Sequence, residues 1–266
     1  MNEINFPFPR INRLKKSGNE KVDEKLNEVF NMLEEYLNNI KPYIFTNIKL
    51  SYDENDDCFI ISRIQQNLSN ILLRSLYIRN GLVDSINSRN TVSLFSNLKS
   101  FIEVPAMLAY LLSLGSNTDK KFIKDSLCAM ALGNKGEGSL RVGKVEAVNI
   151  LTMFKKLDDF INKLKVKEEK RGGDKIMSDF YSLVCNASHP NYDAHDITAI
   201  FEPDKDHWRG ILPEEFKNNF ISESTRYTPP LMVTIAMIQV LAERILKCDV
   251  VGCFKKLNNP LYFEKA

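Results

Sequence analysis

The chain has 266 residues, of which 44% are hydrophobic, so it can bury a continuous core without a covalent staple. Lysine and arginine number 36 against 34 aspartates and glutamates, and a net charge of +2 excludes the strongly basic balance of a dedicated nucleic-acid-binding protein. Five cysteines without a C-x-x-C pair argue against a disulfide framework, and the N-terminus lacks a secretory signal, so we expect a cytoplasmic protein.

The N-terminal residues 1–16 are expected to form an irregular arm, and residues 17–266 a single, mainly α-helical domain. Ser17 and Glu20 make an S-x-x-E capping box. Apolar residues then recur at helical spacing over residues 22–40, which predicts a first helix with one buried stripe.

Two long helices are predicted next. The apolar pattern over residues 60–83 describes the first of them. The second begins after Asn90 and runs to Gly115, and nearly every position over residues 101–114 is apolar. We therefore expect protein on all sides of this second helix.

Glu103 is the one charged residue in that apolar segment. A carboxylate in such surroundings is costly unless it is paired or protonated. Arg74 and Arg79 on the preceding antiparallel helix are its expected partners. One interpretation is a core ion pair that fixes the register of the two helices, and the other is a catalytic carboxylate.

A helix over residues 118–132 is followed by a basic, glycine-rich segment that partly matches a phosphate-binding loop. Residues 138–144 read G-x-x-x-x-G-K, but Val145 stands where such a loop needs a hydroxyl that binds magnesium. We interpret the segment as a flexible basic connector. Its candidate contacts with nucleic-acid phosphate are Lys135, Arg141 and Lys144.

Two further helices are expected over residues 148–164 and 176–184, and the second leads into Y-S-L-V-C-N-A-S-H-P-N-Y-D-A-H at residues 181–195. Because a residue before proline is biased away from helical geometry, His189 should lie at or just past the last turn. The negative end of the helix dipole would stabilise a protonated imidazole there, which suits acid or base catalysis. The structural alternative is a histidine that hydrogen-bonds the free backbone carbonyls.

The residues after His189 add further candidates for a polar site, namely Asn191, Asp193 and His195. Side chains of these kinds can bind zinc or a harder metal ion. However, no C-x-x-C or H-E-x-x-H spacing supports such a site, so no metal site is predicted. Residues 197–212 resemble a small β-hairpin with a turn at E-P-D-K-D. A last long helix begins near Pro229 and is too short and too charged to span a membrane.

The segment Y-S-L-V-C-N-A-S-H-P-N-Y-D-A resembles the helix-ending H-P-N signature of a loose group of bacterial helical proteins. In that group an earlier helix commonly carries an arginine and a glutamate, which here look like Arg79 and Glu103. The arrangement over residues 60–195 resembles the HEPN (higher eukaryotes and prokaryotes nucleotide-binding) superfamily. The resemblance implies an all-helical bundle related to RNases of toxin and phage-defence systems.

One position departs from the pattern of this superfamily. HEPN RNases typically carry an arginine four to six residues before the histidine, whereas residues 183–185 of this chain are Leu, Val and Cys. That guanidinium usually stabilises the developing charge on the phosphate. Either an arginine from elsewhere, such as Arg79, replaces it, or the fold persists without the activity.

Three functions are compatible with these residues. The leading hypothesis is a HEPN-like bacterial stress or phage-defence protein that acts as a metal-independent RNase or toxin effector. In this hypothesis His189 is the general acid or base, Arg79 contacts the phosphate and Glu103 orients Arg79. The second is a non-catalytic helical interaction module, either a sensor or a toxin-neutralising partner. The third is a metal-dependent hydrolase that uses His189, Asp193 and His195.

These hypotheses also imply binding partners. The leading one implies RNA and no cofactor, and none of the three requires a membrane. The HEPN resemblance permits a homodimer, and a role in defence permits a protein partner from the same system.

Overall fold

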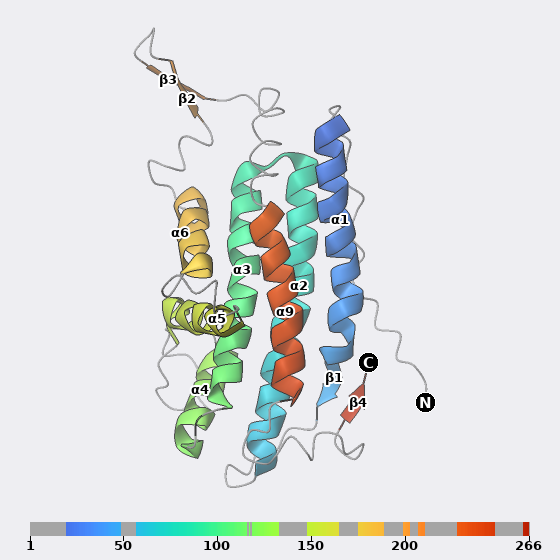
Figure 1. Ribbon diagram of the computed structural model, residues 1–266, viewed down its shortest axis with the longest axis vertical. Helices are drawn as coiled ribbons and strands as arrows, with labels where there is room; N and C mark the ends of the chain where they lie inside the picture. The colour runs from blue at the N-terminus through green and yellow to red at the C-terminus, as the bar shows by residue number, and fades with distance from the viewer. Residues whose placement is uncertain are drawn as a thin grey trace.

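The structure, a computed structural model, describes residues 20–48, 57–115, 117, 119–132, 148–164, 175–188, 199–202, 207–210, 228–247 and 263–265. Within these ranges the chain is mainly α-helical, as the sequence predicts, and seven α-helices pack together (Figure 1). The predicted arm over residues 1–16 and the capping residue Ser17 lie outside the described residues.

The helices correspond closely to those expected from the apolar periodicity. They are α1 (Glu20–Ile40), α2 (Asp57–Ser88), α3 (Thr91–Leu114), α4 (Lys120–Leu132), α5 (Ile150–Leu164), α6 (Ile176–Ser188) and α9 (Thr228–Lys247), with a 3-10 turn, η1 (Lys41–Tyr43), after α1. None of these described helices is both long and apolar enough to cross a lipid bilayer.

Two short strand pairs accompany the helices. Strand β1 (Phe45–Ile48) pairs antiparallel with β4 (Phe263–Lys265), which brings residues near the two ends of the chain side by side. Strand β2 (Ala199–Glu202) pairs antiparallel with β3 (His207–Gly210), inside the 197–212 segment in which a hairpin is expected.

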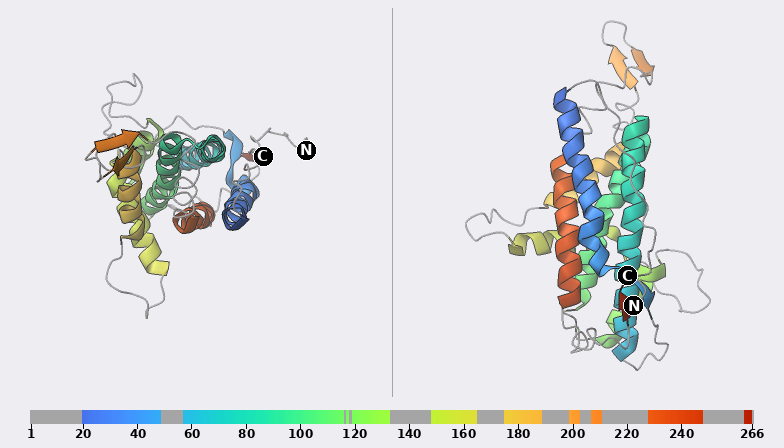
Figure 2. Two further views of the ribbon diagram at one scale, coloured as in Figure 1. Left: turned by 90° about the horizontal axis from the view of Figure 1, so that it is seen from above. Right: turned by 90° about the vertical axis from the view of Figure 1, so that its right-hand side faces the viewer.

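Helix α3 is at the centre of the bundle. Fourteen of its 24 residues are buried, and none of residues 101–114 is exposed. Helices α2, α4, α5, α6 and α9 all pack against it, and in Figure 2 (left) α6 lies on one side of α3 while α1, α2 and α9 lie on the other. The expectation of protein around this helix is confirmed, because an apolar surface on every side favours packing on every side.

The connection between α2 and α3 is very short. The N–H of Asn90 donates to the carbonyl of Ser85 at 3.0 Å, and the N–H of Arg89 donates to the carbonyl of Ile86 at 3.2 Å. This is the Schellman pattern of helix termination, which places its C′ residue in the left-handed region. That residue is Arg89, with a φ of 55°. Asn90 then caps α3 by accepting a hydrogen bond from the N–H of Ser93 at 2.9 Å.

A glycine lets α2 and α3 approach each other closely near this connection. A Cβ at Gly81 would lie only 2.7 Å from the amide oxygen of Asn97. The Asn97 amide donates to the hydroxyl of Ser85 at 3.0 Å, and that hydroxyl lies 2.6 Å from the carbonyl of Gly81. This polar network fixes the register of the two longest helices.

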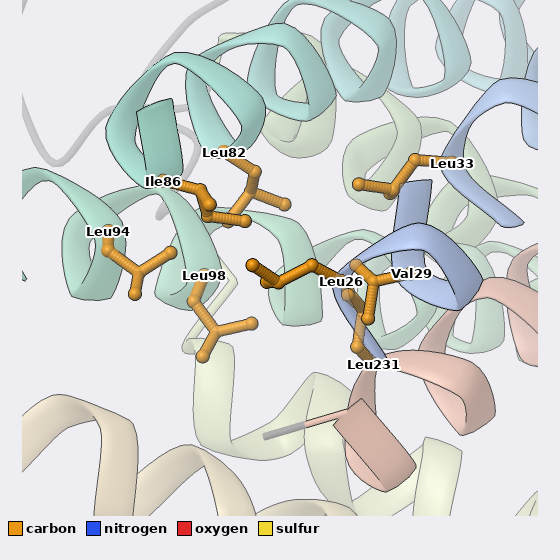
Figure 3. Close-up of a pocket in the computed structure, with 8 residues that line it drawn as sticks. All are labelled: Leu26, Val29, Leu33, Leu82, Ile86, Leu94, Leu98 and Leu231. Carbon is orange, nitrogen blue, oxygen red and sulfur yellow. The ribbon is translucent and has the colours of Figure 1, made fainter. Parts of the chain in front are cut away.

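The same end of the bundle contains an apolar cavity of about 30 Å³ between α1, α2, α3 and α9 (Figure 3). It is lined by aliphatic side chains, namely Leu26, Val29, Leu33, Leu82, Ile86, Leu94, Leu98 and Leu231. Because the lining is entirely aliphatic, the cavity is a feature of core packing and offers no chemistry for a site.

Replacement of Arg89 by glycine should stabilise the protein, because glycine adopts a positive φ without the steric cost of a Cβ. We expect the free energy of unfolding in urea to rise by about 1 kcal/mol. Arg89→Ala is the matched control, since it removes the same side chain and keeps the Cβ. Equal stabilities for the two variants would contradict this account of the turn.

Candidate functional site

The candidate site begins where α6 ends. Helix α6 is described up to Ser188, and His189 is the next residue in the chain. His189, Asn191, Asp193 and His195 lie outside the described residues, as do the basic residues Lys135, Arg141 and Lys144. Of the candidate residues, the structure describes Glu103 on α3 and Arg74 and Arg79 on α2, together with α6 itself.

Glu103 on α3 is bonded to α6. The hydroxyl of Tyr181 donates to a Glu103 carboxylate oxygen at 3.0 Å. The Tyr181 ring also lies against Phe154 of α5, with ring centroids 4.3 Å apart. Burial raises the pKa of Tyr181, and its hydrogen bond to Cys185 and the charge of Glu103 act in the same direction. The tyrosine therefore stays neutral and remains a hydrogen-bond donor to Glu103.

The expected ion pair between Glu103 and an arginine of α2 is wrong. Tyr181 is the partner of Glu103 within the described part of the chain, and Arg74 is exposed. The sequence placed α2 and α3 correctly as neighbours, but it did not fix the rotation of α3. Glu103 is turned toward α6 and Arg79 is turned toward α1.

Arg79 lies deep in the bundle and is only 1% exposed. Its Nη1 donates to the backbone carbonyl of Leu33 on α1 at 3.3 Å, and its Nε and Nη2 donate to the side chain of Asn80 at 3.3 and 3.1 Å. Burial lowers the pKa of Arg79, against opposing effects of Tyr36 and Glu34. The guanidinium thus joins α1 to α2, and contact with a phosphate would require it to leave these acceptors.

The contact of Glu103 lies well before the end of α6. Tyr181 precedes Ser188 by seven residues, which corresponds to about 10 Å along a helix. Glu103 therefore contacts α6 about 10 Å before the C-terminal end of that helix. In the described conformation it is a positioning residue for the helix that leads to His189.

The start of α6 is capped by a side chain from another helix. Asp158 on α5 is buried, and one of its oxygens accepts the N–H of Met177 at 2.9 Å. Its other oxygen accepts the N–H of Ser178 at 3.3 Å and also the Ser178 hydroxyl. The carboxylate satisfies backbone donors that the first turn leaves free, and it meets the positive end of the helix dipole. Sequence reasoning missed this cap, because Asp158 lies 19 residues from the helix start that it serves.

Among the described residues, no three His, Cys, Asp or Glu side chains gather closely enough to hold a metal ion. The residues named for a metal-dependent hydrolase, His189, Asp193 and His195, lie outside those ranges.

No family model, no curated protein and no solved structure matches the chain.

Replacement of Asp158 by alanine should destabilise the protein by about 2 kcal/mol, because the first turn of α6 loses its acceptors. Urea denaturation monitored by circular dichroism measures the change. Asp159→Ala is the matched control: this neighbouring aspartate is exposed, and its removal should change stability by less than about 0.5 kcal/mol. Similar losses in both variants would argue against a cap by Asp158.

Two buried tyrosines should make the fold sensitive to alkaline pH. Burial raises the pKa of Tyr36, against smaller opposing effects of Ser75 and Arg79, and burial likewise raises the pKa of Tyr181. Because the tyrosine pKa is higher in the folded protein than in the unfolded chain, each of these groups stabilises the fold fully below about pH 10, the ordinary pKa of tyrosine. This stabilisation is lost as the pH rises further. The free energy of unfolding should therefore fall between pH 9 and 11.

The tyrosine variants separate this effect from other titrations. Tyr36→Phe and Tyr181→Phe should each weaken the pH dependence of stability above pH 10, whereas Tyr77→Phe, at an exposed position, should leave it as in the parent. The same slope in all four proteins would contradict the proposed role of the buried hydroxyls.

Proposed function

We propose that the chain is a HEPN-like stress or phage-defence protein that cleaves RNA without a metal ion at the end of α6. The supporting observation is that carboxylates from two other helices, one buried and one partly buried, hold α6. Asp158 of α5 binds its first turn and Glu103 of α3 binds Tyr181 in its middle. A catalytic group works only when it is held in a fixed geometry, and a helix fixed in this way can deliver His189 in one orientation.

In the proposed reaction the 2′-hydroxyl of a ribose attacks the adjacent phosphorus, and the bond from phosphorus to the 5′-oxygen of the next nucleotide breaks. A base takes the proton of the 2′-hydroxyl, and an acid protonates the departing 5′-oxygen. The products are a 2′,3′-cyclic phosphate and a 5′-hydroxyl. His189 is the proposed general acid or base, since imidazole changes protonation near neutral pH.

The remaining residues take different roles in this proposal. Glu103 positions α6, and Arg79 joins α1 to α2 as long as it keeps its described acceptors. The phosphate charge then needs another cation. Candidates are the basic residues that follow α4 in the chain, Lys135, Arg141 and Lys144.

A second candidate function, a non-catalytic interaction module, is favoured by two observations. The arginine that the HEPN resemblance offers, Arg79, is buried against α1. In addition, the apolar residues Ile176 and Leu183 of α6 are about half exposed, at 45% and 44%. Exposed apolar side chains on one helix suit a protein partner. Purification of the native complex separates the two functions: an obligate partner, with no cleavage by the isolated chain, favours the module.

Replacement of His189 by alanine should lower the rate of RNA cleavage by a factor of about 10² to 10⁴ and abolish toxicity in cells, because the proton transfer loses its group. The measurement is the cleavage rate of a labelled RNA in a chelating buffer. His207→Ala, which removes another of the three histidines, is the control and should retain activity. Unchanged cleavage and toxicity in the His189 variant would refute the catalytic role.

A further inference from the structure

The outward side of α2 carries a row of side chains with planar polar or aromatic groups. Steps of three or four residues along an α-helix return to the same side, and such steps join the members of this row. They are Arg63, Gln66, Asn70, Arg74 and Tyr77, all partly or fully exposed, and together they form the α2 face. The first and last are 77 − 63 = 14 residues apart, so the face is about 21 Å long.

The charge on the α2 face is entirely positive. Residues 58–83 of this helix contain no aspartate or glutamate, so its carboxylates are confined to Asp57 at the start and to Asp84 beyond the row. Within the described part of the chain, neither Arg63 nor Arg74 forms an ion pair with a carboxylate. The exposed side of α1, by contrast, mixes glutamates with lysines. The α2 face therefore attracts anions.

Arg63 is held in place at one end of the face. Its guanidinium carbon lies 5.2 Å from the ring centroid of Phe59, which is buried. Its Nη1 donates to the side chain of Gln66 at 2.8 Å. A guanidinium that is already ordered loses less conformational entropy when it binds a phosphate.

Tyr77 places an aromatic ring in solvent at the other end of the face. It is 63% exposed, more than any other large apolar side chain in the described part of the chain. Arg74 lies one turn before it and is also exposed. Proteins that bind single-stranded nucleic acid combine cations for the backbone with aromatic rings on which bases stack. The α2 face has both features on one side of one helix.

The surface next to the α2 face continues across α3 toward α6. Asn97, Ser100 and Glu103 follow one another at steps of three residues, and each step turns about 60° around the helix. Asn97 donates to Ser85 of α2, and Glu103 accepts from Tyr181 of α6. Ser100 therefore lies midway between the two helices, and it is partly exposed. A strand bound on α2 can thus reach α6 along one side of the bundle.

We propose that the α2 face binds single-stranded RNA. Arg63 and Arg74 contact phosphates, and Tyr77 stacks on a base. Gln66 and Asn70 donate hydrogen bonds to phosphate or sugar oxygens. The choice of RNA rests on the proposed function, whereas the affinity for a single strand rests on the α2 face alone.

The α2 face binds the strand away from the reacting atoms. Helices α2 and α6 lie on opposite sides of α3 (Figure 2, left). Since packed helices have axes about 8–10 Å apart, the axes of α2 and α6 are at most roughly 20 Å apart. Loss of the face should therefore raise KM for RNA and leave kcat unchanged.

The test measures binding of a fluorescent, single-stranded 2′-O-methyl oligonucleotide, which lacks the attacking hydroxyl and cannot be cleaved by the proposed reaction. Arg74→Gln should reduce the slope of log affinity against log salt by about 0.7, the contribution of one phosphate contact on a single strand, and Arg63→Gln should do the same. Tyr77→Ala should weaken binding by about tenfold and leave the slope unchanged. Tyr77→Phe keeps the ring and should bind like the parent.

Matched controls change other helices. Arg244→Gln removes the same charge from an exposed position of α9, and Phe122→Ala removes an aromatic ring, 45% exposed, from α4. Each should affect binding less than the matching change on the α2 face. Equal effects of Arg244→Gln and Arg74→Gln, or of Phe122→Ala and Tyr77→Ala, would overturn the proposal.

A competitor separates RNA from an acidic protein partner. A poly-aspartate peptide of the same charge as the oligonucleotide has no base to stack on Tyr77, so it should compete weakly. Equal competition by the peptide would overturn the choice of RNA and favour an acidic protein as the ligand.

Binding and cleavage fail separately. No binding by the parent at low salt, or unchanged binding in Arg74→Gln and Tyr77→Ala, overturns the α2 face and leaves the RNase proposal standing. Binding by the parent without any cleavage rejects the RNase and keeps the face. Circular dichroism checks that the variants fold; if Arg63→Gln does not, the variants at the exposed positions Arg74 and Tyr77 carry the test.

Discussion

The central constraint on this fold is the apolar surface of α3, which needs protein on every side. Fourteen of its residues are buried, and α2, α4, α5, α6 and α9 all pack against it. The helix that leads to His189 is therefore held against α3 by core packing as well as by polar contacts. Glu103 is the charged residue within the apolar part of α3, and its hydrogen bond to Tyr181 sets how α6 lies on that surface.

Buried and partly buried polar groups fix the orientation of several described helices relative to one another. Arg79 joins α2 to a carbonyl of α1, Asp158 joins α5 to the first turn of α6, and Asn97 joins α3 to Ser85 of α2. Each lies between helices that apolar contacts alone would allow to slide or rotate. An unsatisfied buried polar group is costly, so each contact favours one arrangement over its neighbours.

The sequence predicted the helices well and their polar contacts poorly, for a physical reason. Apolar spacing at 3.6 residues indicates which residues of a helix are buried, and it located each of the described helices. It does not report which neighbour a buried side chain meets. The partner of Glu103 was wrongly assigned to α2 because the rotation of α3 is decided by all of its neighbours at once. The cap by Asp158 joins residues 19 positions apart, and the approach of Lys124 to the ring of Phe59 joins residues 124 − 59 = 65 positions apart, so no local pattern could show either.

The measurement that tests the central claim most directly is the chemistry of the RNA ends that the purified chain produces in the presence of a chelator. Metal-independent cleavage through the 2′-hydroxyl predicts fragments with 2′,3′-cyclic phosphate and 5′-hydroxyl ends, formed without any divalent ion. Fragments with 3′-hydroxyl and 5′-phosphate ends, formed only after a divalent ion is restored, would contradict the account and favour a metal-dependent hydrolase.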